Sequence, residues 1–141
     1  MIMSALQNLR AAVSETEAWI DDVTQRLGWR DRERVYLVLL ATLHALRDSL
    51  PQDEAIYIGA QLPPLLRGFY YEGWHPGAHL AAKSRSAFLE RIFDGVHRDP
   101  AIDVEQAARA VFAALAARLP AGELEDAKAA TPQPLHGLWP S

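Results

Sequence analysis

The side chains best suited to binding lie in one stretch near the middle of the chain. Four aromatic residues lie within six positions, namely Phe69, Tyr70, Tyr71 and Trp74, and Arg67 lies two residues before the first of them. Aromatic residues and arginine are enriched where proteins bind one another, but aromatic side chains also fill cores because they carry large burial energies. Both interpretations stay open from the sequence, a binding surface or a plug in a core seam. The candidate binding residues are Arg67, Phe69, Tyr70, Tyr71, Glu72, Trp74 and His75.

Histidine spacing raises the question of a metal site. His75 and His79 are four residues apart, which on a helix would place them on one face, but a Pro-Gly pair between them breaks a regular helix. His44 and Asp48 have the same spacing. Neither pair has an assignable third ligand, whereas zinc sites use three or four protein ligands. We predict no metal and no cofactor, and keep as the alternative a small-ligand or metal pocket near His44, Glu72 and His75.

Catalysis has weaker support than binding. The chain has no cysteine, which removes thiolate nucleophiles, disulfides and cysteine-containing zinc sites. It has no Gly-x-Ser-x-Gly motif, no phosphate-binding glycine loop and no dinucleotide fingerprint. Paired carboxylates such as Asp21 and Asp22 lie where a solvated helix face is expected. We therefore predict that the protein is not an enzyme, and catalysis remains the third alternative.

Charge and hydropathy exclude two further classes of partner. The net charge is −4, and the arginines between positions 26 and 34 alternate with Asp31 and Glu33, which favours ion pairs over a phosphate track. The longest apolar run, 35–43, is far shorter than the roughly 18–20 residues of a membrane span. No signal peptide is recognisable at the start. We predict a cytoplasmic protein that binds neither nucleic acid nor membrane.

Helices must position these residues, because apolar side chains recur at helical spacing and never alternate over a long stretch. Ser14 and Glu17 match a capping box, which predicts a helix that starts there and stops at Gly28. Residues 5–12 would then form a short extra helix or a frayed lead-in. Asp31 is expected to cap a second, largely buried helix that ends at Pro51, and Pro51 to open a third.

The second half of the chain repeats this pattern. Shifting the sequence by 69 residues gives ten identities between 41 and 68 without a gap, including Leu50-Pro51 on Leu119-Pro120, where composition alone would give about two. Ser84 or Ser86, Asp103 and Pro120 are the expected helix starts. A three-helix unit alone buries little surface, so the two units should share one core.

We therefore predict an all-α fold, a single compact helical bundle built from two pseudo-symmetric tandem three-helix repeats. One domain spans 1–141, with the first repeat at about 14–69, a linker at 70–83 and the second repeat at about 84–139. The Pro-Pro pair after 62 would end the third helix, and 65–69 would add a short turn.

Several segments resemble the prokaryotic family named domain of unknown function 2267. They are 41–51 (ATLHALRDSLP), 59–63 followed by 67–74 (RGFYYEGW), 107–113 and 122–126, and the resemblance extends over about 14–140. Two positions depart from the family pattern: His75, where a basic residue is more usual, and Thr131, where leucine is. The resemblance implies a small soluble helical domain, and it supplies no catalytic residues.

The functional hypothesis is a non-catalytic interaction module. It would hold a protein partner or a second copy of itself, as a homo-oligomer, through the aromatic segment 67–74.

Overall fold

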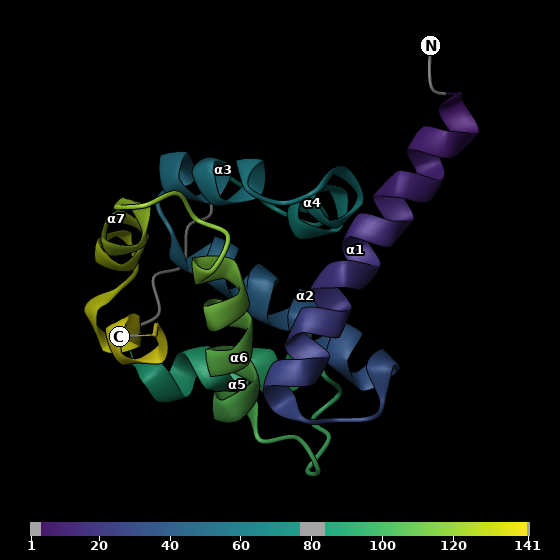
Figure 1. Cartoon of the computed structure of the whole chain (residues 1–141). Coiled ribbons are helices and arrows are strands. Elements are labelled where there is room, and N and C mark those ends of the chain that lie inside the picture. The colour runs from purple at the N-terminus through teal and green to yellow at the C-terminus, as the bar shows by residue number, and fades with distance from the viewer. Residues whose placement is uncertain (1–3, 77–83, 141) are drawn as a thin grey trace.

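A computed structural model describes residues 4–76 and 84–140, and within these ranges it contains helices and no strand (Figure 1). The all-helical, compact architecture predicted from the sequence is confirmed. No helix of the described ranges is both long and apolar enough to cross a membrane. The elements are α1 (Ala5–Leu27), α2 (Arg32–Ser49), α3 (Gln52–Ala60), α4 (Pro64–Tyr71), α5 (Arg85–Gly95), α6 (Val104–Ala116), α7 (Glu123–Ala130) and the 3₁₀ helix η1 (Gln133–Leu138).

The first helix starts ten residues earlier than the sequence predicted. Ser4 is its N-cap: the Ser4 hydroxyl accepts from the Gln7 backbone N–H at 3.1 Å, and the Gln7 side chain accepts from the Ser4 N–H at 2.9 Å. This is a capping box, and Ser14 with Glu17 lies inside α1, so the predicted start at Ser14 was wrong. The end at Gly28 was right, because the glycine adopts φ 71°.

Three of the other predicted helix starts are right, and two are wrong. Asp31 caps α2, Ser84 caps α5 and Asp103 caps α6, each through its side-chain oxygen, as predicted. Pro51 is the residue before α3 and not its first helical residue. Helix α7 begins at Glu123, after Gly122 at φ 87°, three residues beyond the predicted start at Pro120.

Residues expected to form a turn and a linker instead form a helix. Pro64 occupies the first position of α4, where its fixed φ is favourable, and the helix continues through Gly68 to Tyr71. The linker predicted at 70–83 therefore begins no earlier than Glu72. Its residues 77–83, with His79, lie outside the described residues.

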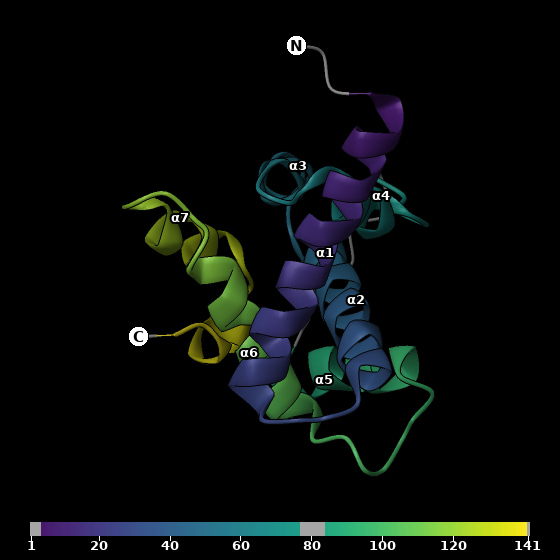
Figure 2. The same cartoon turned by 45° about the vertical axis from the view of Figure 1, so that its right-hand side comes forward.

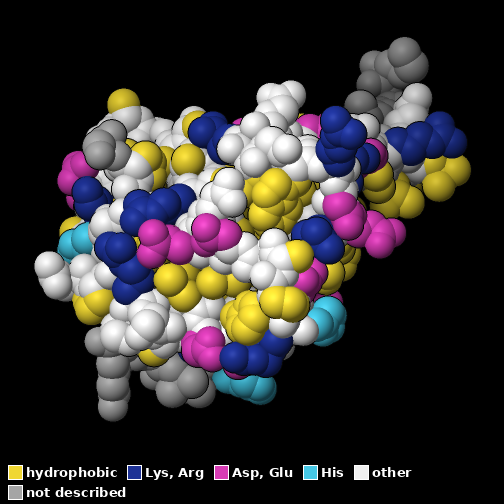
Figure 3. Space-filling view, turned by 90° about the horizontal axis from the view of Figure 1, so that it is seen from below, with side chains coloured by type: hydrophobic (Ala, Val, Ile, Leu, Met, Phe, Trp, Pro, Cys, Tyr) yellow, Lys and Arg dark blue, Asp and Glu magenta, His cyan; other side chains and the backbone are white. Residues whose placement is uncertain are grey.

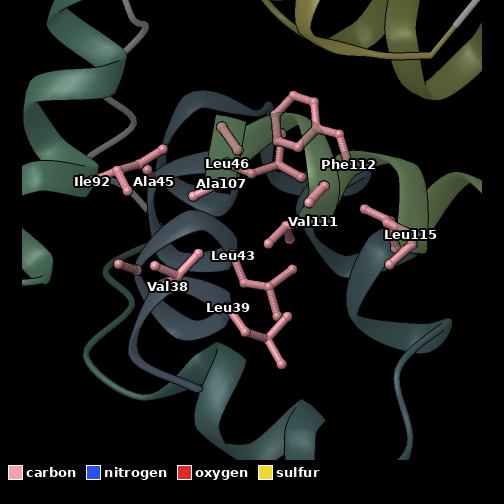
Figure 4. Packing of buried hydrophobic residues seen from close by; sticks show 14 of the residues in the cluster. Val38, Leu39, Leu43, Ala45, Leu46, Ile92, Ala107, Val111, Phe112 and Leu115 are labelled. Atoms are coloured by element: carbon pink, nitrogen blue, oxygen red, sulfur yellow. The ribbon is translucent and has the colours of Figure 1, made fainter. Parts of the chain in front are cut away.

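The core lies between α2 and α6, which are the most buried helices. Leu39, Leu43 and Leu46 of α2 point toward Val111, Phe112 and Leu115 of α6, and all six side chains are fully buried (Figure 4). Each such side chain contributes about 1.5–3 kcal/mol through its removal from water. This contact fixes the position of α2, which carries the polar residues His44, Arg47 and Asp48.

The remaining helices surround this pair. Helix α1 packs on α2, α4 and α6, while α5 packs on α2, α6 and η1. Helix α3 contacts α4 and α7. Both cartoon views draw α3 beside α4 (Figures 1 and 2). In both views the N-terminal turns of α1 extend beyond the rest of the molecule.

Candidate functional site

Tyr70, at the centre of the aromatic segment, is a core residue. Its side chain is 0 % exposed, and its hydroxyl donates to the Ala55 carbonyl of α3 at 2.7 Å. Burial also raises the pKa of Tyr70, so the phenol stays a neutral donor. Tyr70 therefore joins α4 to α3 and offers no surface to a partner.

Arg67 also serves the fold. Its Nε donates to the Gly59 carbonyl at 3.0 Å and its Nη2 to the Leu62 carbonyl at 2.8 Å. Gly59 is in the last turn of α3 and Leu62 lies just beyond its end, where helical partners run out and a positive charge is favourable. The guanidinium thus caps α3.

The accessible part of the predicted site consists of three aromatic side chains that are half-buried. Phe69 meets Tyr36 of α2 edge-on, with ring centroids 6.2 Å apart, and Tyr71 stacks on Trp74 at 5.4 Å. Glu72 and His75 are exposed. The structure therefore divides the segment between a core side and a surface side.

Two side chains of α2 hold the end of α4. The His44 Nε2 atom lies 2.7 Å from the Phe69 carbonyl, and because a carbonyl only accepts, this nitrogen carries the proton. Arg47 Nη1 donates to the carbonyls of Tyr70 at 2.7 Å and Glu72 at 2.9 Å. These are carbonyls at the last turn of α4 that lack a helical partner.

Arg47 and its neighbour Asp48 extend this connection to α5. Arg47 is 4 % exposed and donates from Nε and Nη2 to the two Asp48 oxygens, at 2.8 and 3.2 Å. Arg91 of α5 donates to Asp48 Oδ2 at 2.9 Å. We call Arg47, Asp48 and Arg91 the charged triad. It joins α2, α4 and α5, and so gives the arginine and the aspartate of the segment 41–51 a structural role.

A hollow of about 300 Å³ lies between α2 and α5. We call it the α2–α5 hollow. Its lining residues are Leu37, Leu40, Ala41, His44, Ala45, Asp48, Arg91, Gly95 and His97. Of the three residues proposed for a ligand pocket, His44 lines this hollow, and Glu72 and His75 do not. In the described part of the chain, no three histidine or carboxylate side chains gather closely enough to hold a metal ion.

The projecting end of α1 carries an apolar stripe. Leu6, Leu9 and Val13 are 64 %, 57 % and 41 % exposed, and Figure 3 shows hydrophobic side chains at this end of the molecule beside basic ones. A short extra helix or a frayed lead-in was expected for residues 5–12, and the apolar stripe was not predicted. The signal was the three-then-four spacing of Leu6, Leu9 and Val13, hidden by the misplaced helix start.

Comparisons with known proteins agree with the resemblance seen in the motifs. No match among curated proteins is found. A family model described as an uncharacterized conserved protein matches residues 16–138, which includes the charged triad and the α2–α5 hollow but not the apolar stripe of α1. The chain therefore belongs to the DUF2267 family of uncharacterized conserved proteins.

Proposed function

We propose that the protein is a non-catalytic interaction module that associates with a second copy of itself through the apolar stripe of α1. The observation that carries this proposal is the exposure of Leu6, Leu9 and Val13 on one helix. Large apolar side chains gathered on an exposed helix face commonly mark an interaction surface. The sequence predicted an interaction through residues 67–74, and we now propose that the interaction surface is on α1.

The stripe has the spacing of a coiled-coil seam. After Leu6, Leu9 and Val13, the same three-then-four spacing continues to Thr16, Ile20, Val23 and Leu27. Thr16, Val23 and Leu27 are buried within the molecule, whereas Leu6, Leu9 and Val13 are exposed. The stripe thus continues an interface that the fold already uses, past the point where this chain supplies a partner.

The stripe can pair with a second copy of itself. In an antiparallel pair with Val13 of one copy beside Leu9 of the other, each seam contact forms twice, and each stripe covers the exposed apolar side chains of the other. Such a two-fold contact is self-complementary. Three side chains per copy are fewer than a stable interface of about 800 Å² a side contains, so we expect a weak dimer.

The surface side of the aromatic segment is the second candidate. Phe69, Tyr71 and Trp74 keep exposed area, but each already contacts another ring or helix of its own chain. A partner would gain less apolar surface there than at Leu6 and Leu9. The proposed order of preference is therefore α1 first and the aromatic segment second.

We also infer that the fold arose by duplication of a unit with four helical elements. The two units correspond element by element: α1 to α5, α2 to α6, α3 to α7 and α4 to η1. Under this correspondence each helix contact has a counterpart in the structure. The contact of α2 with α5 matches that of α6 with α1, and the contact of α2 with α4 matches that of α6 with η1. Leu43 and Phe112, which the 69-residue shift aligns, are both fully buried. The contact pattern supports a pseudo-two-fold axis between α2 and α6.

Sedimentation velocity over about two orders of magnitude of protein concentration tests the self-association. The double variant Leu6→Gln with Leu9→Gln should remain monomeric where the wild type shifts to a dimer. Ile56→Gln is the matched control, because Ile56 on α3 is 45 % exposed but lies outside the stripe. The double variant Tyr71→Ala with Trp74→Ala tests the aromatic surface. A wild type that stays monomeric throughout, or a dimer lost only in the aromatic variant, would overturn the assignment to α1.

A further inference from the structure

We propose that the α2–α5 hollow binds a small organic carboxylate, with the acid at its polar end and a short apolar tail along α2. The hollow lies on α2 and α5, away from the apolar stripe of α1, so binding there is independent of self-association.

The two ends of the hollow differ in chemistry. Leu37, Leu40 and Ala41 supply an apolar wall near one end, and Asp48 and Arg91 supply the polar end, with His44 between them on the same face of α2. The volume of about 300 Å³ is at the lower limit for small-molecule pockets, which occupy about 300–1,000 Å³. A small amphipathic ligand therefore fits better than a nucleotide.

The sign of the charge at the polar end favours an anion. The charged triad contains two guanidinium groups and one carboxylate, so it carries one net positive charge. Asp48 is already bonded to both arginines. Arg91 is 37 % exposed and uses a single N–H in the contacts found within the described residues. Arg91 lines the hollow, and arginine recognises a carboxylate with two parallel hydrogen bonds.

Backbone strain marks the rim of the hollow. His97 and Arg98 follow α5 at φ 59° and 52°, a left-handed conformation that is unfavourable for residues with a side chain. The 69-residue shift aligns His97 with Gly28, which ends α1 at φ 71° without that penalty. A strained residue that persists at a pocket is a reason to expect function there, and His97 is one of the residues that line the hollow.

Close helix packing gives the hollow a firm floor. A Cβ added at Gly95 would lie 2.8 Å from the Cβ of Ala41, so α2 and α5 approach each other closely where a glycine meets an alanine. The hollow is therefore formed by the fold itself and does not require a ligand to open it.

Titration of ¹⁵N-labelled protein tests the proposal, with hexanoate as the probe and 1-hexanol and hexylamine as controls of equal length. We expect hexanoate to shift the amide signals of 37–48 and 91–97 in a saturable manner. The alcohol should bind at least tenfold more weakly, and the amine should cause no saturable shift. Equal binding of alcohol and acid, or hexanoate shifts scattered over the surface, would overturn the proposal.

Two variants separate binding from structure. Arg91→Gln should weaken hexanoate binding at least tenfold, while Arg109→Gln, at an arginine on α6 that pairs with Glu105, should leave it unchanged. His97→Gly should raise Tm, because it relieves the left-handed strain, and should weaken binding. Unchanged hexanoate binding in both Arg91→Gln and His97→Gly would refute the assignment. The amide spectrum of Arg91→Gln without ligand shows whether this variant is folded, so that a loss of binding is not mistaken for a loss of structure.

Discussion

Replacing Arg47 by alanine should destabilise the protein far more than replacing Arg91, although both arginines bond to Asp48. Arg47 is 4 % exposed and donates to the carbonyls of Tyr70 and Glu72 as well as to the carboxylate. The side chain of Arg91 is 37 % exposed. The comparison tests whether the polar residues of the 41–51 segment serve the fold.

The expected size follows from what each change leaves behind. Arg47→Ala leaves the buried Tyr70 carbonyl without its donor, which costs about 1–3 kcal/mol, and it breaks a buried ion pair, for which losses of about 3–5 kcal/mol are typical. Asp48 keeps Arg91, which reduces the second contribution. We expect a total of about 3–5 kcal/mol for Arg47→Ala and at most about 1 kcal/mol for the more exposed Arg91→Ala.

Urea unfolding followed by far-ultraviolet circular dichroism measures both values. Arg47→Lys is an intermediate variant, since it keeps the charge but not the forked guanidinium that reaches four acceptor oxygens, and its stability should fall between those of Arg47→Ala and wild type. If Arg47→Ala lost less than about 1 kcal/mol, or if Arg91→Ala lost as much, the idea that α2 holds the end of α4 would be refuted.

Three further predictions concern packing and pH. Leu46→Ala and Leu115→Ala, at aligned core positions, should each cost about 2–5 kcal/mol in urea unfolding, and a near-zero value at either would contradict the proposed equivalence of the two units. Gly95→Ala should destabilise the protein, because the new Cβ meets a neighbour at 2.8 Å. Gly68→Ala, in open space within α4, should stabilise it by about 0.5–1 kcal/mol. If thermal melts shifted the Tm of both variants in the same direction, this prediction would be wrong. Burial, reinforced by two nearby carboxylates, raises the pKa of Glu54 above its ordinary 4.5, so the native state binds this proton more tightly and the wild type loses stability as pH rises through that range. Glu54→Gln should therefore be more stable than wild type at pH 7, with the difference vanishing below about pH 4, and a Gln variant that is less stable at pH 7 would contradict this.

The parts of the fold set by local chemistry were predictable from the sequence. Asp31 and Asp103 cap helices and Gly28 ends one, because each acts on backbone groups within a few residues of itself. The same reasoning failed at Ser14, because a capping-box pattern also occurs inside a continuing helix. It failed at α4 too, where Pro64 was interpreted as a helix breaker although it occupies the favourable first position.

The site depends on contacts between distant residues, which one sequence does not reveal. Nothing near Arg47 indicates that it meets the carbonyl of Tyr70, 23 residues further on. The aromatic cluster was recognised, but the division between buried Tyr70 and half-buried Trp74 arises from how α4 rests on α3. The strain at His97 is a property of the backbone and has no counterpart in residue type.

Cross-linking of single-cysteine variants tests self-association through α1 most directly, because the natural chain contains no cysteine. Ala12→Cys places a thiol beside the apolar stripe without removing any of its side chains, and Ala60→Cys places one on the exposed end of α3. With a short bifunctional maleimide, the Ala12→Cys protein should form covalent dimers readily and the Ala60→Cys protein should not. Equal cross-linking of the two variants, or none at Ala12→Cys at concentrations where the wild type sediments as a dimer, would contradict the proposed interface.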